Sequence, residues 1–130
     1  MSQSSYVPTV TAPPIQVLII WPDDTYELRT IEQNVDSFQS IVGGWVDTIP
    51  TEHCVFWVDE DAPDKGCPTN HLATYLWWRF NPAMEGKDVL QGAVVVTGGP
   101  DGEHSHPVAD DVIEYFEWMR GVYMKEEGRE

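Results

Sequence analysis

Two pairs of β-rich runs in the first half of the chain are each joined by only three turn residues, and this spacing constrains the fold most. Residues 16–21 and 25–32 are separated by Pro-Asp-Asp, and residues 45–49 and 53–58 by Pro-Thr-Glu. Parallel neighbours need a crossover of about a dozen residues, whereas antiparallel neighbours are joined by short turns. The spacing therefore predicts two antiparallel hairpins. The first run is continuously apolar, which is typical of a central strand buried on both faces.

A short helix is predicted between the two hairpins, at residues 35–42. Asn34 is a favourable N-cap residue, and Gly43-Gly44 can supply the left-handed backbone that ends a helix. The apolar positions recur at three- and four-residue spacing: Val35, Phe38, Ile41 and Val42.

Two further helices and a fifth strand are predicted in the second half. Asn70 offers an N-cap for a helix at 71–80. The inward side of that helix is expected to hold Leu72, Tyr75, Leu76 and one of Trp78 or Phe80. The fifth strand falls at residues 90–97. The last helix, with Pro107 in its first turn, has one apolar stripe: Val108, Val112, Phe116, Met119 and Tyr123.

These elements predict an α+β fold, with a mostly antiparallel sheet of about five strands and two to three helices packed on it. Residues 1–15 are expected to form a flexible N-terminal arm, residues 16–124 a single domain, and residues 125–130 an acidic C-terminal tail. The arm has no Lys or Arg and no continuous apolar run, so it reads as neither a signal nor a transit peptide. We therefore expect a cytoplasmic protein with Cys54 and Cys67 reduced.

The charge of the chain limits its partners. Seven Lys and Arg against 22 Asp and Glu give a formal net charge of −15. Phosphate contacts require clustered basic residues, so direct binding to nucleic acid is not expected, and neither is an anionic membrane. The chain is nevertheless 42% hydrophobic and 12% aromatic, which is enough to fold around a core.

A set of short motifs in the middle of the chain carries a family resemblance. The set comprises Val-Gly-Gly at residues 42–44, Asp-Glu at residues 59 and 60, and Pro-x-Asn at residues 68–70 before an Ala-Thr helix. In this order the motifs resemble a small phage and bacterial family, domain-of-unknown-function family 3846, over residues 16–97. The resemblance implies a phage accessory protein, with Gly43, Gly44, Pro68 and Asn70 as structural motif residues. The long C-terminal helix lies outside the pattern.

An acidic loop and neighbouring aromatic residues suggest protein binding. Residues 59–70 form a long loop in which Lys65 is the one basic residue, and six tryptophans are many for a core of this size. Trp77 and Trp78 are adjacent on a helix and cannot both face one core, and Trp118 is off the stripe of its helix. We therefore hypothesise that the chain is a non-catalytic protein that binds a host protein. In one form of this hypothesis, binding inhibits the host protein. The predicted contact residues are Asp59, Glu60, Asp61, Asp64, Asn70, Trp77 and Trp78.

The sequence also fits two alternative functions. In the first, the loop carboxylates and those of the C-terminal helix imitate nucleic-acid phosphate and block a DNA-binding host enzyme. In the second, a zinc ion or small ligand is held by Cys67, His71, His104 and His106, which have donor types suited to zinc. A second copy of the chain is a further partner that exposed aromatic residues would fit.

No catalytic residue and no cofactor are predicted. His53 and Cys54 are adjacent, but successive strand residues point to opposite faces, so the imidazole cannot activate the thiol. Cys54 lies among apolar residues and is expected to be a buried small hydrophobe.

Overall fold

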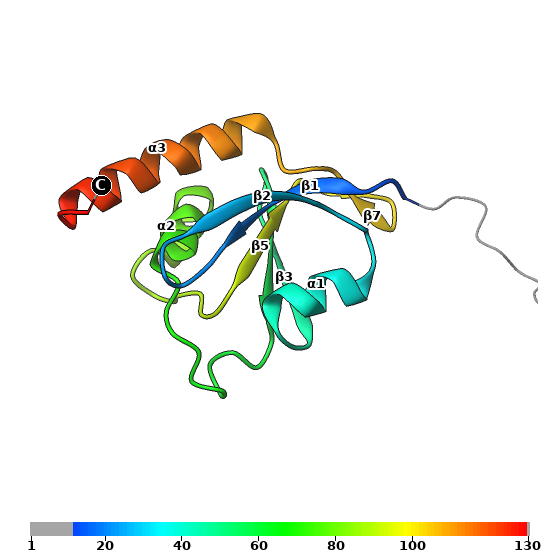
Figure 1. Ribbon diagram of the computed structural model, residues 1–130, viewed down its shortest axis with the longest axis horizontal. Helices are drawn as coiled ribbons and strands as arrows, with labels where there is room; N and C mark the ends of the chain where they lie inside the picture. Colours follow the sequence, from blue (N-terminus) through cyan, green and yellow to red (C-terminus); the bar gives the residue numbers. More distant parts are fainter. Residues whose placement is uncertain (1–11, 130) are drawn as a thin grey trace, which may run out of the picture.

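Five antiparallel strands form the central sheet of the computed structural model, which describes residues 12–129 (Figure 1). The strands are β1 (Ile15–Ile20), β2 (Tyr26–Ile31), β3 (Val46–Pro50), β4 (Val55–Asp59) and β5 (Val94–Thr97). Their order across the sheet is β2-β1-β5-β4-β3, so β1 is interior while β2 and β3 form the edges. The predicted hairpins are confirmed: β1 pairs with β2, and β3 with β4. Strand β5 joins them by pairing with both β1 and β4.

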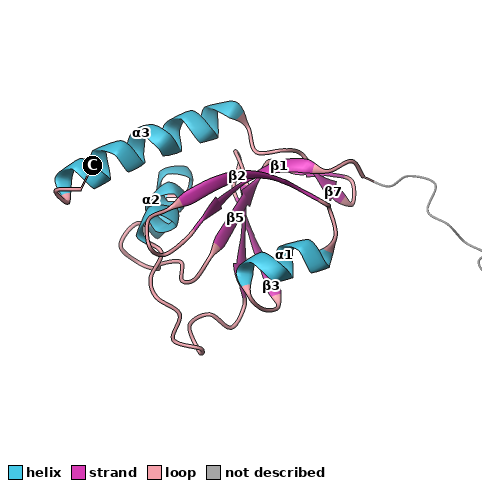
Figure 2. Cartoon of the chain, viewed as in Figure 1, coloured by secondary structure: helices cyan, strands magenta, loops and turns pink. Residues whose placement is uncertain are grey.

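Helices cover both faces of the sheet (Figure 2). The helix α1 (Val35–Val42) lies on one face, and α2 (His71–Phe80) and α3 (Asp110–Glu126) lie on the other. A single 3-10 turn, η1 (Pro82–Met84), follows α2. The predicted α+β fold is therefore correct.

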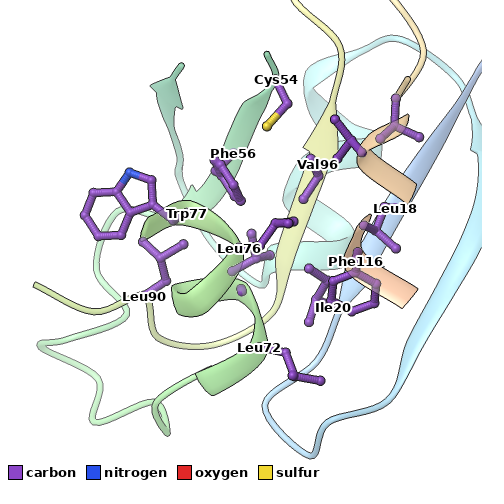
Figure 3. Packing of buried hydrophobic residues seen from close by; sticks show 14 of the residues in the cluster. Leu18, Ile20, Cys54, Phe56, Leu72, Leu76, Trp77, Leu90, Val96 and Phe116 are labelled. Atoms are coloured by element: carbon purple, nitrogen blue, oxygen red, sulfur yellow. The ribbon is translucent and has the colours of Figure 1, made fainter. Parts of the chain in front are cut away.

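The larger part of the core fills the space between the sheet and the helices α2 and α3 (Figure 3). Fully buried members include Phe56 and Leu76, together with Phe116 on α3. Burying a large apolar side chain contributes roughly 1.5–3 kcal/mol to folding. On the other face, Phe38 of α1 stacks on Trp57 of β4, with ring centroids 4.0 Å apart.

The inward side of α2 differs from the predicted one. Trp77 is only 4% exposed and lies in the core with Leu90 (Figure 3), whereas Tyr75 is 36% exposed. The rotation follows from Asn70, because its buried side chain fixes the first turn of α2 relative to the sheet. The prediction that Tyr75 faces inward was therefore wrong.

The segment after β5 also departs from the prediction. It contains a small hairpin of β6 (Pro100–Asp101) and β7 (His104–Ser105) that the sequence did not indicate. The last helix begins at Asp110 and not around Pro107. Residues 106–108 make extended backbone bonds instead, since the Gly98 N–H donates to the His106 carbonyl and the Val108 N–H donates to the Gln16 carbonyl.

The far end of α3 returns to the turn between β1 and β2. The Arg120 side chain donates to the Asp24 carbonyl oxygen at 2.8 Å, and the Arg129 guanidinium pairs with the buried Asp24 carboxylate. The structure thus follows the predicted C-terminal tail as far as Arg129. Most of the predicted N-terminal arm, residues 1–11, lies outside the described residues, as does Glu130. Within residues 12–129, none of the helices combines the length and apolarity that crossing a membrane requires.

Candidate functional site

The Val-Gly-Gly motif lies against an ion pair between an exposed lysine, Lys65, and a buried carboxylate, Asp59. Gly43 ends α1 in the left-handed conformation, with φ of 92°, and its carbonyl accepts a hydrogen bond from Lys65 Nζ at 3.1 Å. The same ammonium group pairs with the Asp59 carboxylate at the end of β4. A Cβ at Gly44 would lie 2.8 Å from both Asp59 Oδ1 and Lys65 Nζ, so only glycine leaves room for the pair.

The ion pair fixes the start of the acidic loop. Asp59 is 3% exposed, and its Oδ1 accepts a hydrogen bond from the backbone N–H of Asp61 at 2.9 Å. Burial opposes ionisation of Asp59, but hydrogen bonds from Lys65 and Asp61 and the Lys65 charge outweigh it and lower the pKa of this carboxyl. The hydrogen bond to Asp59 correspondingly raises the pKa of Lys65. Asp59 is thus a structural residue, and its carboxylate is not part of the exposed surface.

We expect the Asp59–Lys65 pair to make the free energy of unfolding vary with pH in the acid range. The pKa of Asp59 is lower in the folded than in the unfolded chain, so its contribution is present above the unfolded value near 3.8 and is lost as the pH falls through the folded value. Asp59→Asn keeps the size of the side chain but removes the charge. The variant should unfold at lower urea concentration than the wild type at pH 7, and the difference should narrow at pH 3. A difference that is the same at both pH values would contradict this role.

The remaining carboxylates of the loop point into solvent. Glu60 and Asp64 are exposed and Asp61 is half-buried. Within residues 12–129 there are three ion pairs, and none of them includes these three carboxylates. Lys65, the one cation of the loop, is occupied by Asp59. The exposed part of the loop therefore presents carboxylates that form no ion pair with any of residues 12–129.

Trp45 is 70% exposed and lies next to Glu60, the first of these carboxylates. The backbone N–H of Glu60 donates to the Trp45 carbonyl at 2.7 Å, one step beyond the β3–β4 pair of Val46 and Asp59. Cross-strand neighbours of this kind have their side chains close together. A shallow hollow beside the indole reaches along α1 and is lined by Asp36, Gln39, Ser40, Gly43, Gly44 and Trp45. We call Trp45, Glu60, Asp61 and Asp64 the Trp45 surface.

Sequence reasoning did not select Trp45, although two signals pointed to it. It follows the Gly-Gly stop, so it is outside the apolar face of α1, and it immediately precedes β3, an edge strand. A large aromatic residue at such a place has no neighbouring layer to cover it.

The other predicted contact residues lie in the interior or on a different element. Asn70 is fully buried, and Trp77 is in the core. Trp78 is half-buried, and its indole N–H donates to the Asp88 carbonyl at 2.9 Å. Of the seven predicted contact residues, the structure thus brings only Glu60, Asp61 and Asp64 together at the exposed part of the loop.

The Pro-x-Asn motif pairs with the segment that leads into β5. The Gly92 N–H donates to the Pro68 carbonyl, Thr69 bridges to Gln91, and the Asn70 N–H donates to the Leu90 carbonyl. The Asn70 side chain then links three elements. Its Nδ2 donates to the Ile20 carbonyl at 2.8 Å and to the Gly92 carbonyl at 2.9 Å, and its Oδ1 accepts from the Ala73 N–H. The predicted N-cap is thus also a connection between α2 and the sheet.

The four candidate zinc ligands are not brought together. Cys67 lies against Gly92, before β5, and His106 lies against Gly98, after β5. Six residues of extended chain separate these points by about 20 Å. His71 is exposed on α2 and His104 belongs to β7. Within residues 12–129, no group of three or more His, Cys, Asp or Glu side chains is placed to hold a metal ion. The four-ligand zinc site is therefore wrong, because its halves lie at opposite ends of one strand.

His104 does line a small cleft near the start of α1. The cleft has a volume of about 190 Å³ and an apolar floor of Phe38 and Trp57. Its rim includes Gln33, whose side-chain oxygen accepts a hydrogen bond from the Ser105 N–H. Cys67, His71 and His106 do not line this cleft, so the small-ligand alternative retains only one of its four residues there.

The adjacent residues His53 and Cys54 lie in different environments. Cys54 is fully buried, and burial raises the pKa of its thiol to about 11 in spite of a contact with the Thr51 hydroxyl. His53 is exposed and packs on the ring of Phe80. Cys54 is therefore the buried small hydrophobe that the sequence predicted.

Fold and surface together define a small acidic α+β protein whose five-stranded antiparallel sheet lies between α1 on one face and α2 and α3 on the other. The chain belongs to the family described as "Domain of unknown function (DUF3846)", which matches residues 15–120. The match extends beyond the region of the predicted resemblance and includes the first eleven residues of α3, from Asp110 to Arg120. No curated protein and no solved structure gives a significant match.

Proposed function

We propose that this protein is a non-catalytic accessory protein of phage type, which binds a protein of the host bacterium in its cytoplasm through the Trp45 surface. The observation that carries the proposal is the combination of a 70% exposed indole with three carboxylates that no ion pair of the described residues neutralises. The phage setting rests on the family resemblance of the sequence motifs, and the chain belongs to that family over residues 15–120.

The chemistry of the surface selects the kind of partner. A tryptophan beside carboxylates fits an apolar pocket whose rim carries Lys or Arg. The net charge of −15 speeds the encounter with a basic surface and disfavours acidic ones. The Asp59–Lys65 pair holds the loop in place before binding, so little conformational entropy is lost on association.

The environments of the adjacent residues Cys54 and His53 support binding over catalysis. The Cys54 thiol is buried and has a raised pKa, so it is a poor nucleophile at neutral pH. The adjacent imidazole of His53 packs on Phe80.

Affinity capture with matched tryptophan variants tests the proposal. The wild type should capture a host protein that Trp45→Ala fails to capture, since truncating a central interface tryptophan costs about 2 kcal/mol, or roughly thirtyfold in affinity. Trp118→Ala is the matched control, because it removes an exposed indole from α3, outside the Trp45 surface. Equal capture by the wild type and Trp45→Ala, measured again with the purified partner, would contradict the proposal.

The same purified pair separates this proposal from imitation of nucleic acid. Binding through the Trp45 surface should weaken moderately with salt and should persist in the presence of duplex DNA. A steep loss of affinity with salt, together with full competition by DNA, would instead indicate an acidic nucleic-acid mimic.

A further inference from the structure

The side of α3 that faces away from the sheet carries a second exposed tryptophan. Trp118 is 63% exposed and Val122, one turn later, is 39% exposed. Figure 1 shows α3 along the outside of the molecule, with α2 and the sheet on its other side. The outward stripe recurs at three- and four-residue spacing, and all of its members are exposed: Asp111, Glu114, Trp118, Gly121 and Lys125.

Gly121 stands in this stripe although nothing within the described chain requires a glycine there. It is helical, and a Cβ at this position would meet no atom within 4 Å. Glycine in a helix interior costs roughly 1 kcal/mol relative to alanine. The missing side chain contributes to a hollow of about 490 Å³ that is also lined by Trp118, Val122 and Lys125. A glycine that weakens its own helix but opens its surface is typical of a close approach by another group.

We infer that this face binds a second copy of the same chain, with the two α3 helices antiparallel about a twofold axis. A twofold interface places one patch against itself, so a projecting group and a matching hollow must occur on the same face. Trp118 is the projecting group, and the hollow at Gly121 is three residues away. When Trp118 of one copy lies over Gly121 of the other, the same antiparallel register places Glu114 opposite Lys125 of the second copy.

The charges along the stripe favour this orientation. Acidic Asp111 and Glu114 precede Trp118, and basic Lys125 follows it. Antiparallel helices bring the acidic half of one copy to the basic half of the other, whereas parallel helices would oppose like charges. The net charge of −15 on each chain opposes association at long range, and physiological salt screens that repulsion beyond about 8 Å.

The interface is small and is separate from the Trp45 surface. One helix from each chain gives an area at the low end for specific complexes, so we expect a dissociation constant in the micromolar range. The Trp45 surface begins three residues after α1 ends, and α1 and α3 lie on opposite faces of the sheet (Figure 1). A host partner and a second copy can therefore be bound at the same time.

Sedimentation velocity of the full chain in physiological salt tests the inference. Between about 10 and 500 µM the wild-type mass should rise from that of a 14.7 kDa monomer towards twice that value. Trp118→Ala should remain monomeric throughout, and the matched control Trp45→Ala should dimerise like the wild type. A wild type that stays monomeric, or equal loss in both variants, would overturn the inference and would leave host binding by Trp45 to its own test.

Charge-reversal variants examine the register of the two helices, and a glycine variant examines the hollow. Glu114→Lys and Lys125→Glu should each weaken the dimer, and the double variant should restore it, because the pairs are then reversed and not lost. Gly121→Ala should raise the melting temperature of the dilute monomer while weakening the dimer, a combination that a purely structural glycine would not produce. Absence of rescue in the double variant, or a dimer unaffected by Gly121→Ala, would contradict the proposed packing.

Discussion

Asn70→Ala is expected to destabilise the protein by about 3 kcal/mol or more, and to lower its melting temperature by roughly 10 °C. The alanine removes the cap of α2, a loss of about 1 kcal/mol. It also leaves the buried carbonyl oxygens of Ile20 and Gly92 without the Nδ2 donor, at about 1–3 kcal/mol each. Urea unfolding followed by circular dichroism measures the free-energy difference.

The other capping asparagine provides the control. Asn34 accepts one hydrogen bond, from the Ser37 N–H, and is exposed. Asn34→Ala should therefore cost only about 1 kcal/mol. Asn70→Asp isolates the donor role, because it keeps the cap but places a carboxylate oxygen against the two carbonyls. If Asn70→Ala and Asn34→Ala lower the free energy of unfolding by the same amount, the connection between α2 and the sheet contributes nothing to stability.

Gly98→Ala is expected to have the second large effect and to lower the free energy of unfolding by about 2–4 kcal/mol. A Cβ at Gly98 would lie 2.4 Å from the Pro107 carbonyl oxygen and 3.0 Å from His106 Cβ. A small movement of the chain cannot relieve either contact. The Gly98 N–H is hydrogen-bonded to the His106 carbonyl, and the Val108 N–H is hydrogen-bonded to the Gln16 carbonyl of β1. The segment that leads from β5 into α3 would have to move away from the sheet.

Gly99→Ala is a control one residue away. A Cβ there meets nothing within 4 Å, so we expect a change of less than about 0.5 kcal/mol. Thermal unfolding of the two variants should give clearly different midpoints. Similar midpoints would mean that the close approach at Gly98 is absorbed by small shifts of the chain.

Those parts of the fold that depend on local backbone chemistry could be predicted from the sequence. Asn34 and Asn70 cap their helices, Gly43 ends α1 in the left-handed conformation, and the short turns fix the antiparallel hairpins. Each of these rests on residues within a few positions of one another. The pattern of the first strand also predicted its interior place correctly.

Features that depend on distant contacts could not be predicted in the same way. The rotation of α2 is set by carbonyls of Ile20 and Gly92, which lie 50 and 22 residues from Asn70. The burial of Asp59 depends on Lys65 and on the space above Gly44, so its charge alone gave a misleading indication of exposure. The start of α3 was displaced because residues 106–108 bond to the sheet region.

The order of the strands also determines how the protein avoids aggregation. Among the strands of residues 12–129, the outermost ones, β2 and β3, each have one backbone edge that pairs with no neighbouring strand, and such an edge can accept a strand from another molecule. The edge at β2 carries Glu27 and Arg29, paired with each other, and the edge at β3 carries Asp47 and ends in Pro50. Charged residues and proline at edges block the addition of further strands. Copies of this chain that meet at high concentration are thereby directed away from sheet extension, which is compatible with the reversible contact between α3 helices that we propose.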